Sequence, residues 1–290
     1  MIELPNGRFA DIHVFSGDGS VWLLLLDATE EHDRKQRMQQ KAYEMTLLQE
    51  RERKLNDKLE ETNEALRRSQ EGLSREYQRS EALLLNILPA PIAERLKTQE
   101  QIADKHAEVS VLFADIVRFT EKARSVGAED TLTILNSFFK SADFLSEHYG
   151  CEKIKTIGDC VMVVAGLPQA RSDHAEALAQ FALELRAAGA RESFGGEPLM
   201  LRIGIHSGPI VAGVIGKKRF AYDLWGDTVN LAARIQTSAE PNEIRISDAT
   251  RKLLGQNFAC DALAEAELRG AGRVQMWRLL ASSLAPLDLC

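Results

Sequence analysis

The sequence predicts an α+β fold, in which a ferredoxin-like β-α-β-β-α-β core sheet with helices is preceded by a long coiled-coil helix. Two observations support this fold class. Residues 30–88 contain no proline and a single glycine, Gly72, which is typical of one continuous helix. Residues 108–290 alternate short apolar runs with amphipathic segments, which is typical of strands and helices that share a sheet. The expected segments are therefore 1–29, 30–88, 89–107 and 108–290.

Within residues 1–29, two apolar runs surround the turn sequence Gly17-Asp18-Gly19, which predicts two paired strands. A lone hairpin is only marginally stable in water, so it needs a partner surface. The second run, Val21 to Leu26, leads into Asp27-Ala28-Thr29-Glu30-Glu31. This stretch resembles the final strand and exit motif of PAS sensory domains. The alternative is an ordinary N-terminal hairpin that packs on the helix or on another chain.

The helix expected over residues 30–88 carries an imperfect heptad repeat of apolar residues. Polar residues interrupt the repeat, so the pattern predicts a two-stranded coiled coil of moderate stability. A solvated helix that packs on its own C-terminal domain is the alternative. One seam position takes Met45, Leu59, Leu66, Leu73 and Ile87, and the other takes Leu48, Leu55 and Leu83.

Pro89 and Pro91 end this helix, because proline lacks an amide hydrogen and biases the preceding residue toward extended geometry. The linker or transducer element that follows is expected to hold a short helix and then a polar stretch over residues 98–107.

In the last domain, we expect a turn at Ser207-Gly208-Pro209 between two strands. The expected strands are 109–114, 155–164 as a hairpin, 199–206, 210–215 and 243–246, with 219–224 as a further candidate; the expected helices are 129–148, 172–188 and 227–237, the last capped by Asp227.

Composition narrows the class of protein. The net charge of −7 argues against a nucleic-acid binder, which needs a basic face. The run from Val21 to Leu26 is far too short to span a bilayer, and no basic segment with a cleavage site precedes it. We therefore expect a cytoplasmic protein without a membrane span. Four scattered cysteines lack zinc or redox spacing and are expected to be free thiols: Cys151, Cys160, Cys260 and Cys290.

Two carboxylates stand at the ends of apolar strands. Asp159 follows Gly158, which permits a tight turn, and it precedes the apolar run 161–164. Asp115 ends the run 111–116. If the two strands are neighbours, both carboxylates can hold one or two Mg²⁺ ions together with phosphate oxygens, because Mg²⁺ prefers hard oxygen ligands.

Five ordered stretches of the chain carry a resemblance to a known family. They are Leu83 to Pro91, Phe113 to Thr120, Lys155 to Asp159, Arg202 to Gly208 and Tyr222 to Arg234. Together they resemble the class III nucleotidyl cyclases, which are the adenylyl and guanylyl cyclases. The resemblance covers about residues 83 to 280. It implies that residues 108–290 form a cyclase catalytic domain, and hence that the chain is an enzyme of the phosphorus-oxygen lyase type.

The resemblance implies a role for each matching residue. Asp115, Asp159 and the backbone carbonyl of Ile116 would bind two Mg²⁺ or Mn²⁺ ions per active site. The turn that leads into Phe119 and Thr120 would offer backbone amides to the phosphates.

The resemblance also assigns base recognition to Lys155 and Asp223. Adenine offers an N1 acceptor, which suits the lysine, and a 6-amino donor, which suits the aspartate. Guanine reverses that pattern, so the pair predicts ATP as substrate. Asn230 and Arg234 are four residues apart and share one face of a helix. In the family this pair orients the ribose and stabilises charge on the pentavalent phosphorus.

In this family the metal-binding aspartates come from one subunit, and the base-reading and arginine residues come from the other. We therefore expect a head-to-tail homodimer with two equivalent sites, joined through the coiled coil and the catalytic domains. The coiled coil would also pass a signal from an upstream sensor through the joint at Leu83 to Pro91.

Two positions depart from the family pattern. Arg118 stands where glycine is usual, so it adds a phosphate contact or crowds the turn. The run Leu268 to Arg273 replaces a lysine-glycine-lysine-glycine motif, and Arg269 is the candidate for the lysine that contacts the triphosphate. Two alternative functions remain: a guanylate cyclase that converts GTP to cyclic GMP, and a catalytically silent nucleotide-binding dimerisation module.

Overall fold

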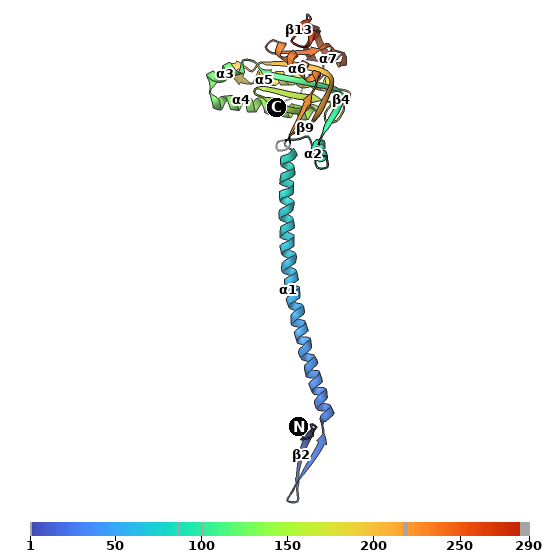
Figure 1. Cartoon of the computed structure of the whole chain (residues 1–290). Helices are drawn as coiled ribbons and strands as arrows, with labels where there is room; N and C mark the ends of the chain where they lie inside the picture. Colours follow the sequence, from blue (N-terminus) through green and yellow to red (C-terminus); the bar gives the residue numbers. More distant parts are fainter. Residues whose placement is uncertain (1, 86, 100, 217–219, 285–290) are drawn as a thin grey trace. The chain divides into compact units, whose positions relative to one another are not determined.

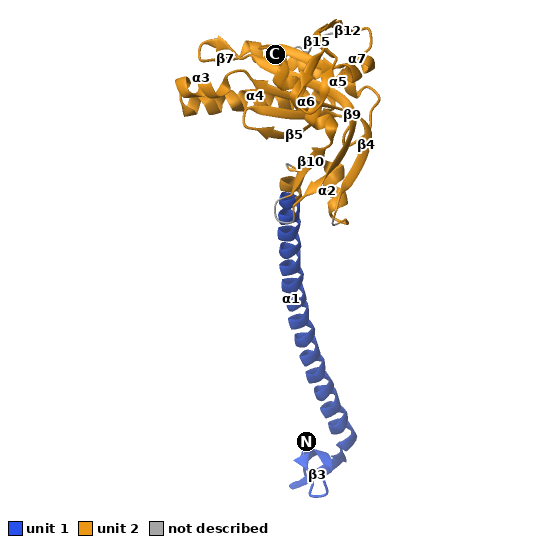
Figure 2. Cartoon of the chain, turned by 45° about the horizontal axis from the view of Figure 1, so that its top comes forward, with its two compact units in different colours: residues 1–80 blue, residues 81–290 orange. Residues whose placement is uncertain are grey.

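The structure is a computed structural model, and it describes residues 2–85, 87–99, 101–216 and 220–284. The chain divides into two compact units, Met1–Ser80 and Glu81–Cys290 (Figure 2). Within the described ranges, no helix is both long enough and apolar enough to cross a bilayer. Cys151, Cys160 and Cys260 are free thiols, whereas Cys290 lies outside the described residues.

The first unit begins with a three-stranded antiparallel sheet, one strand more than the sequence predicts. Its strands are β1 (Ile2–Glu3), β2 (Phe9–Gly17) and β3 (Ser20–Asp27), in the order β1-β2-β3 (Figure 1). Val21 to Leu26 are exposed, although all six are apolar. Because side chains alternate along a strand, both faces of this sheet present aliphatic or aromatic groups.

The sheet is joined to the next helix by side-chain contacts around Thr29. The Thr29 amide and hydroxyl donate to Oδ1 of Asp27 at 3.0 and 2.6 Å. These bonds, with the charge of Arg8, lower the pKa of Asp27. The ring of Phe9 stacks on His32 with centroids 3.6 Å apart. The chain therefore leaves β3 in a defined direction.

Helix α1 spans Thr29–Leu85, close to the predicted bounds, and none of its residues is buried in the single chain. Its heptad residues are exposed, including Leu59, Leu66 and Leu73. An apolar seam of this length needs a partner helix to leave water.

The second unit contains the remaining elements. They are α2 (Ala90–Leu96), β4 (Ala103–Ile116), α3 (Phe119–Val126), α4 (Ala128–Tyr149), β5 (Glu152–Ile157), β6 (Cys160–Ala165), α5 (His174–Arg191), β7 (Ser193–Phe194), β8 (Glu197–Pro198), β9 (Leu201–Ile215), β10 (Ala221–Trp225), α6 (Asp227–Ser238), β11 (Glu243–Ser247), α7 (Asp248–Leu253), β12 (Phe258–Ala262), β13 (Ala266–Leu268), β14 (Gly272–Val274) and β15 (Met276–Ser282).

The main sheet confirms the predicted fold class. Its order is β12-β15-β11-β9-β4-β6-β5, and β10 pairs with β9. Along the chain, β4, α4, β5, β6, α5 and β9 give the expected β-α-β-β-α-β arrangement. Within it, β4 lies between β9 and β6, antiparallel to both. The ends of β4 and β6 that carry the acidic residues therefore meet.

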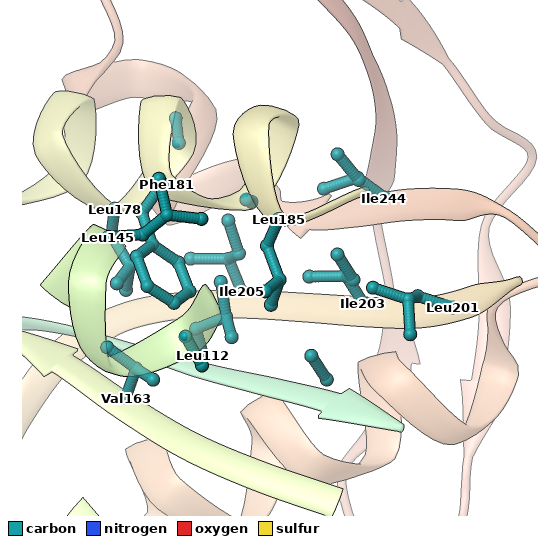
Figure 3. Close-up of a cluster of buried hydrophobic side chains, with 14 of the residues drawn as sticks. Leu112, Leu145, Val163, Leu178, Phe181, Leu185, Leu201, Ile203, Ile205 and Ile244 are labelled. Atoms are coloured by element: carbon teal, nitrogen blue, oxygen red, sulfur yellow. The ribbon is translucent and has the colours of Figure 1, made fainter. Parts of the chain in front are cut away.

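Apolar side chains cover both faces of this sheet. On one face, α4 and α5 pack against the strands, and Figure 3 shows Leu145, Phe181 and Leu185 directed toward Leu112 and Ile203. On the other face, a second cluster joins Val111, Phe113 and Met162 to Ala232 of α6. Alternate residues of β4 thus serve opposite faces, which explains why this strand is an unbroken apolar run.

Three local predictions are wrong. Ser207-Gly208-Pro209 is not a turn but part of the continuous strand β9, because Ala107 and Glu108 of β4 bulge opposite Pro209, where no amide hydrogen is needed. The polar stretch expected over 98–107 is shorter, since β4 already begins at Ala103. Asp227 does not cap α6: Gly226 occupies the cap position and Asp227 is the first helical residue.

Candidate active site

The two acidic residues that the sequence singles out lie side by side. Asp115 is next to the last residue of β4, and its strand partner is Cys160, the residue after Asp159. Burial and the neighbouring charge of Asp159 raise the pKa of Asp115 to about 6, while the charge of Arg202 opposes this shift. A carboxylate whose ionisation is opposed by a neighbouring carboxylate is a favourable ligand for a divalent cation, whose charge relieves the repulsion.

The donor chemistry at this point fits a hard cation. Both side chains supply carboxylate oxygens, the ligands that Mg²⁺ and Mn²⁺ prefer. The side chain of Ile116 is a hydrocarbon without a donor atom, so only its backbone carbonyl can serve as a ligand. Among the residues that the structure describes, no three acidic, histidine or cysteine side chains are placed so that together they could hold a metal ion. The remaining ligands would have to come from the backbone and from substrate phosphates.

Arg202 is a site residue to which the sequence analysis gave no role. It is the cross-strand partner of Asp115 on β9, and its Nε is buried without a hydrogen-bond partner among the described residues. Arg202 as a whole is half-buried, and a guanidinium with an unused donor beside two carboxylates is suited to an anion such as phosphate. Sequence could have indicated it only through its place in the run Arg202 to Gly208.

Lys155 and Asp223 meet, as a shared role requires. Lys155 comes from β5 and Asp223 from β10, strands that are 68 residues apart in sequence at this point. The Lys155 Nζ donates to Oδ2 of Asp223 at 2.5 Å, and the Leu224 amide donates to Oδ1 at 2.8 Å. One carboxylate oxygen is therefore fixed by the strand itself, which orients the pair.

Asn230 and Arg234 lie on α6, whose position over the sheet depends on two glycines of β9. A Cβ on Gly204 would be 2.1 Å from the backbone nitrogen of Gln236, and a Cβ on Gly208 would be 2.8 Å from Oγ1 of Thr228. Only glycine permits this approach. The helix that carries Asn230 and Arg234 is thus seated directly on the strand that carries Arg202.

The phosphate-binding candidates occupy two turns. Phe119 begins α3 and its ring packs on Phe194 with centroids 5.7 Å apart, so its backbone amide, rather than its side chain, is available. Thr120 is exposed next to it. Arg118 has φ of 56°, the left-handed region where glycine is favoured. Arg269 is exposed in the turn between β13 and β14.

A buried chain of hydroxyl groups links β4 and β9, the strands that carry Asp115 and Arg202, to neighbouring elements. Ser110 contacts Nδ1 of His174 at 2.8 Å and Oγ of Ser207 at 2.6 Å. Ser207 contacts Thr250 at 2.9 Å, and Thr250 contacts Ser247 at 3.1 Å. Ser247 ends the chain at Nδ1 of His206, 2.7 Å away. Burial lowers the pKa of both histidines, which favours the neutral form of each ring.

Comparison with known proteins decides the family. The family described as the adenylate and guanylate cyclase catalytic domain matches residues 102–281. The chain belongs to this family. Its eight-stranded sheet, its acidic pair and its α6 arginine are therefore parts of a cyclase catalytic domain.

Curated relatives include cyclases of both substrate types. An adenylate cyclase of Mycobacterium tuberculosis is 43% identical over 221 residues, which are 75% of this chain and 50% of that protein. The human guanylate cyclase soluble subunit beta-2 is 35% identical over 238 residues, 81% of this chain and 39% of that protein. The chain thus spans about half the length, or less, of these relatives.

Solved cyclase domains have the same fold. The guanylate cyclase domain of RhGC from Catenaria anguillulae, in complex with GTP, matches with a TM-score of 0.60 and 32% identity, covering 62% of this chain and 99% of that chain. The adenylyl cyclase CyaB from P. aeruginosa matches with a TM-score of 0.57 and 27% identity, covering 62% of this chain and 97% of that chain. The similarity does not separate the two substrate types.

Proposed function

We propose that this cyclase is an adenylate cyclase, which converts ATP to 3′,5′-cyclic AMP and pyrophosphate. The contact between Lys155 and Asp223 carries this choice of base. The Lys155 ammonium group can donate to N1 of adenine, and the Asp223 carboxylate can accept from the 6-amino group. Guanine carries a donor at N1 and an acceptor at position 6. The Lys155 donor would therefore face a donor, and the Asp223 acceptor would face an acceptor.

The metal ions would lie at Asp115, Asp159 and the Ile116 carbonyl. When bound, two Mg²⁺ or Mn²⁺ ions make the ribose 3′-hydroxyl easier to deprotonate and neutralise charge on the triphosphate. Arg202 adds a fixed positive charge beside the same two carboxylates, where phosphate oxygens would lie.

The remaining residues of the chain act on the substrate directly. Asn230 orients the ribose, so that its 3′-oxygen faces the α-phosphorus. Arg234 stabilises the negative charge that develops there as pyrophosphate leaves, which lowers the barrier more than it strengthens ground-state binding. The amides at Phe119 and Thr120, with the Arg269 guanidinium, bind phosphate oxygens.

Within the described residues, no hydrogen bond or ion pair connects the acidic pair with Lys155, Asp223, Asn230 or Arg234. This supports a site shared between two copies, each giving one set of residues to each of two equivalent sites. The exposed seam of α1 supplies the means of dimerisation, because a coiled coil raises the effective concentration of the catalytic domains. We therefore propose a homodimer whose stalk is residues 30–88 and whose catalytic domain is residues 108–290.

The stalk can influence base recognition through a buried contact. Leu88, just after α1, lies in the same cluster as Tyr222, the residue before Asp223. We propose that residues 1–29 are the end of a PAS-like sensor and that its signal reaches the site by this route. Replacing Pro89 and Pro91 with alanine should change basal or stimulated turnover, and unchanged turnover would argue against the route.

The primary test is turnover by the purified full chain. ATP and GTP are supplied separately with Mg²⁺ or Mn²⁺, and cyclic nucleotide is measured. We expect cyclic AMP from ATP, much less product from GTP, and none from the Asp159→Ala variant. Preference for GTP would identify a guanylate cyclase, and a well-folded dimer inactive on both nucleotides would support the silent module.

A second test addresses the base-reading pair. Lys155→Glu with Asp223→Asn reverses the donor and acceptor pattern and should lower kcat/KM for ATP by roughly a hundredfold or more, because unpaired polar groups would face adenine. Equal losses on ATP and GTP would show that the pair does not read the base.

A further inference from the structure

We propose that Gly270 is a positioning residue for Arg234: the bare backbone of the turn between β13 and β14 supports the flat face of that guanidinium. This inference rests on the proposed catalytic role of Arg234. It concerns a residue to which neither the sequence pattern nor the chemistry of the reaction gives a function.

The turn has a geometry that requires glycine. The Ala271 amide donates to the Leu268 carbonyl at 2.9 Å, which closes a four-residue turn with Arg269 and Gly270 at its centre. Gly270 has φ of 72°. A positive φ at the third residue, as in a type II turn, strains side chains other than glycine or asparagine.

The guanidinium of Arg234 lies next to this glycine. A Cβ placed on Gly270 would be 3.2 Å from Nη2, 3.5 Å from Cζ and 3.5 Å from Nη1 of Arg234. These distances place the added carbon out of the plane of the guanidinium and nearest to Nη2. The end of the side chain therefore lies close to the turn on one side, and its N–H groups, which lie in the plane, remain free.

Nothing else among the described residues fixes the end of this side chain. No carboxylate forms an ion pair with Arg234, and no hydrogen bond to its guanidinium is present in the described part of the chain. A long arginine side chain has many conformers, so an unpaired one needs a surface to rest on. The turn supplies that surface without neutralising the charge.

The turn itself is anchored to the same helix. Leu268 and Val274, on the two strands of the hairpin, pack with Ile235 and Leu231 of α6 in a small cluster that also includes Met276. The hairpin forms no strand pairs with the main sheet. Its position is therefore set by this packing on α6 and by its short connections to β12 and β15.

An added methyl group should displace the arginine rather than unfold the protein. The atoms that it would meet belong to the flexible end of one side chain, not to backbone. The backbone strain of Gly270→Ala is matched by a control in the same hairpin, because Gly272 has φ of 71° and nothing lies within 4 Å of its added Cβ. The two variants differ only in what the methyl group meets.

The experiment uses the full chain with Gly270→Ala, Gly272→Ala, Arg234→Ala and the double variant Gly270→Ala with Arg234→Ala. Turnover of ATP with Mn²⁺ gives kcat and KM, and thermal unfolding gives stability. We expect Gly270→Ala to lower kcat about tenfold or more with KM within about threefold, since misplacement of a catalytic group affects the transition state most. Gly272→Ala should retain kcat, with the same unfolding midpoint as Gly270→Ala. In the Arg234→Ala background, Gly270→Ala should have no further effect.

The outcomes separate the two proposals. If Arg234→Ala leaves kcat unchanged, the proposed role of Arg234 is wrong. If Arg234→Ala abolishes turnover but Gly270→Ala behaves like Gly272→Ala, the positioning role is overturned and the proposed function stands. Should Gly270→Ala fail to fold, Gly270→Asn is compared with Gly272→Asn, since asparagine tolerates a positive φ. Equal kcat in that pair would also overturn the positioning role.

Discussion

Gly204→Ala tests whether the close approach of α6 to β9 determines both stability and catalysis. The added Cβ would be 2.1 Å from the Gln236 nitrogen and 2.5 Å from its Cα, and both are backbone atoms of α6. Carbon atoms in contact need about 3.5 Å, so the helix must withdraw by more than about 1 Å. Because backbone cannot rotate away, we expect unfolding to become easier by about 3 kcal/mol, at the upper end for an overfilled core.

The same displacement should affect turnover. Arg234 is two residues before Gln236, so a helix shift of about 1 Å reduces kcat by roughly a hundredfold in the molecules that remain folded. Urea unfolding and cyclic nucleotide production measure the two effects. Gly72→Ala is the opposite control. Nothing lies within 4 Å of its added Cβ, and a glycine inside a helix is about 1 kcal/mol less stabilising than alanine, so this variant should become more stable. A Gly204→Ala protein within about 1 kcal/mol of the unsubstituted stability would refute the reasoning.

Three further predictions concern other parts of the catalytic domain. Arg118→Gly should raise the free energy of unfolding by about 1 kcal/mol, because it removes a side chain from a left-handed backbone. A lower midpoint urea concentration for unfolding would contradict this. Arg202→Met should raise KM for the nucleotide at least about tenfold while leaving the fold intact; an unchanged KM would rule out a phosphate contact. For Glu243, burial opposes ionisation, but the Glu240 amide, Arg278 and Arg245 together lower its pKa below 4.5. Its stabilisation is therefore present above about pH 4.5 and is lost as pH falls through the lower folded value. Glu243→Gln should lower the free energy of unfolding by about 2 kcal/mol at pH 7 and make this free energy depend less on pH in the acid range. If the variant and the unsubstituted protein lose stability in parallel as pH falls, Glu243 does not cause the acid dependence.

The fold class followed from the sequence because local pattern and global fold agree in this chain. The proline-free stretch after Glu30 gave the long helix almost to the residue, and the apolar runs at Val111 and Val161 gave the two central strands. Their pairing brought Asp115 and Asp159 together, as expected. The helix and the two strands depend on contacts between neighbours along the chain, which periodicity records, whereas their pairing joins distant residues and was only a condition of the predicted metal site.

Other features depend on contacts between distant residues, and the sequence did not reveal them. Pro209 usually marks a turn, yet here a bulge on the opposite strand accommodates it inside β9. The reason for glycine at position 204 appears only when Gln236 is placed above it. Arg202 became a site residue only through its cross-strand partner, Asp115. In each case the deciding atom lies far away along the chain.

The hydroxyl chain between His174 and His206 has a consequence for the placement of hydrogen atoms. Its five links require five hydrogens, and the hydroxyls of Ser110, Ser207, Thr250 and Ser247 supply four. The fifth must come from one imidazole, while the other accepts with a bare Nδ1. The two rings therefore hold opposite tautomers, and a proton gained at one Nδ1 can be balanced only if every hydroxyl between them reverses.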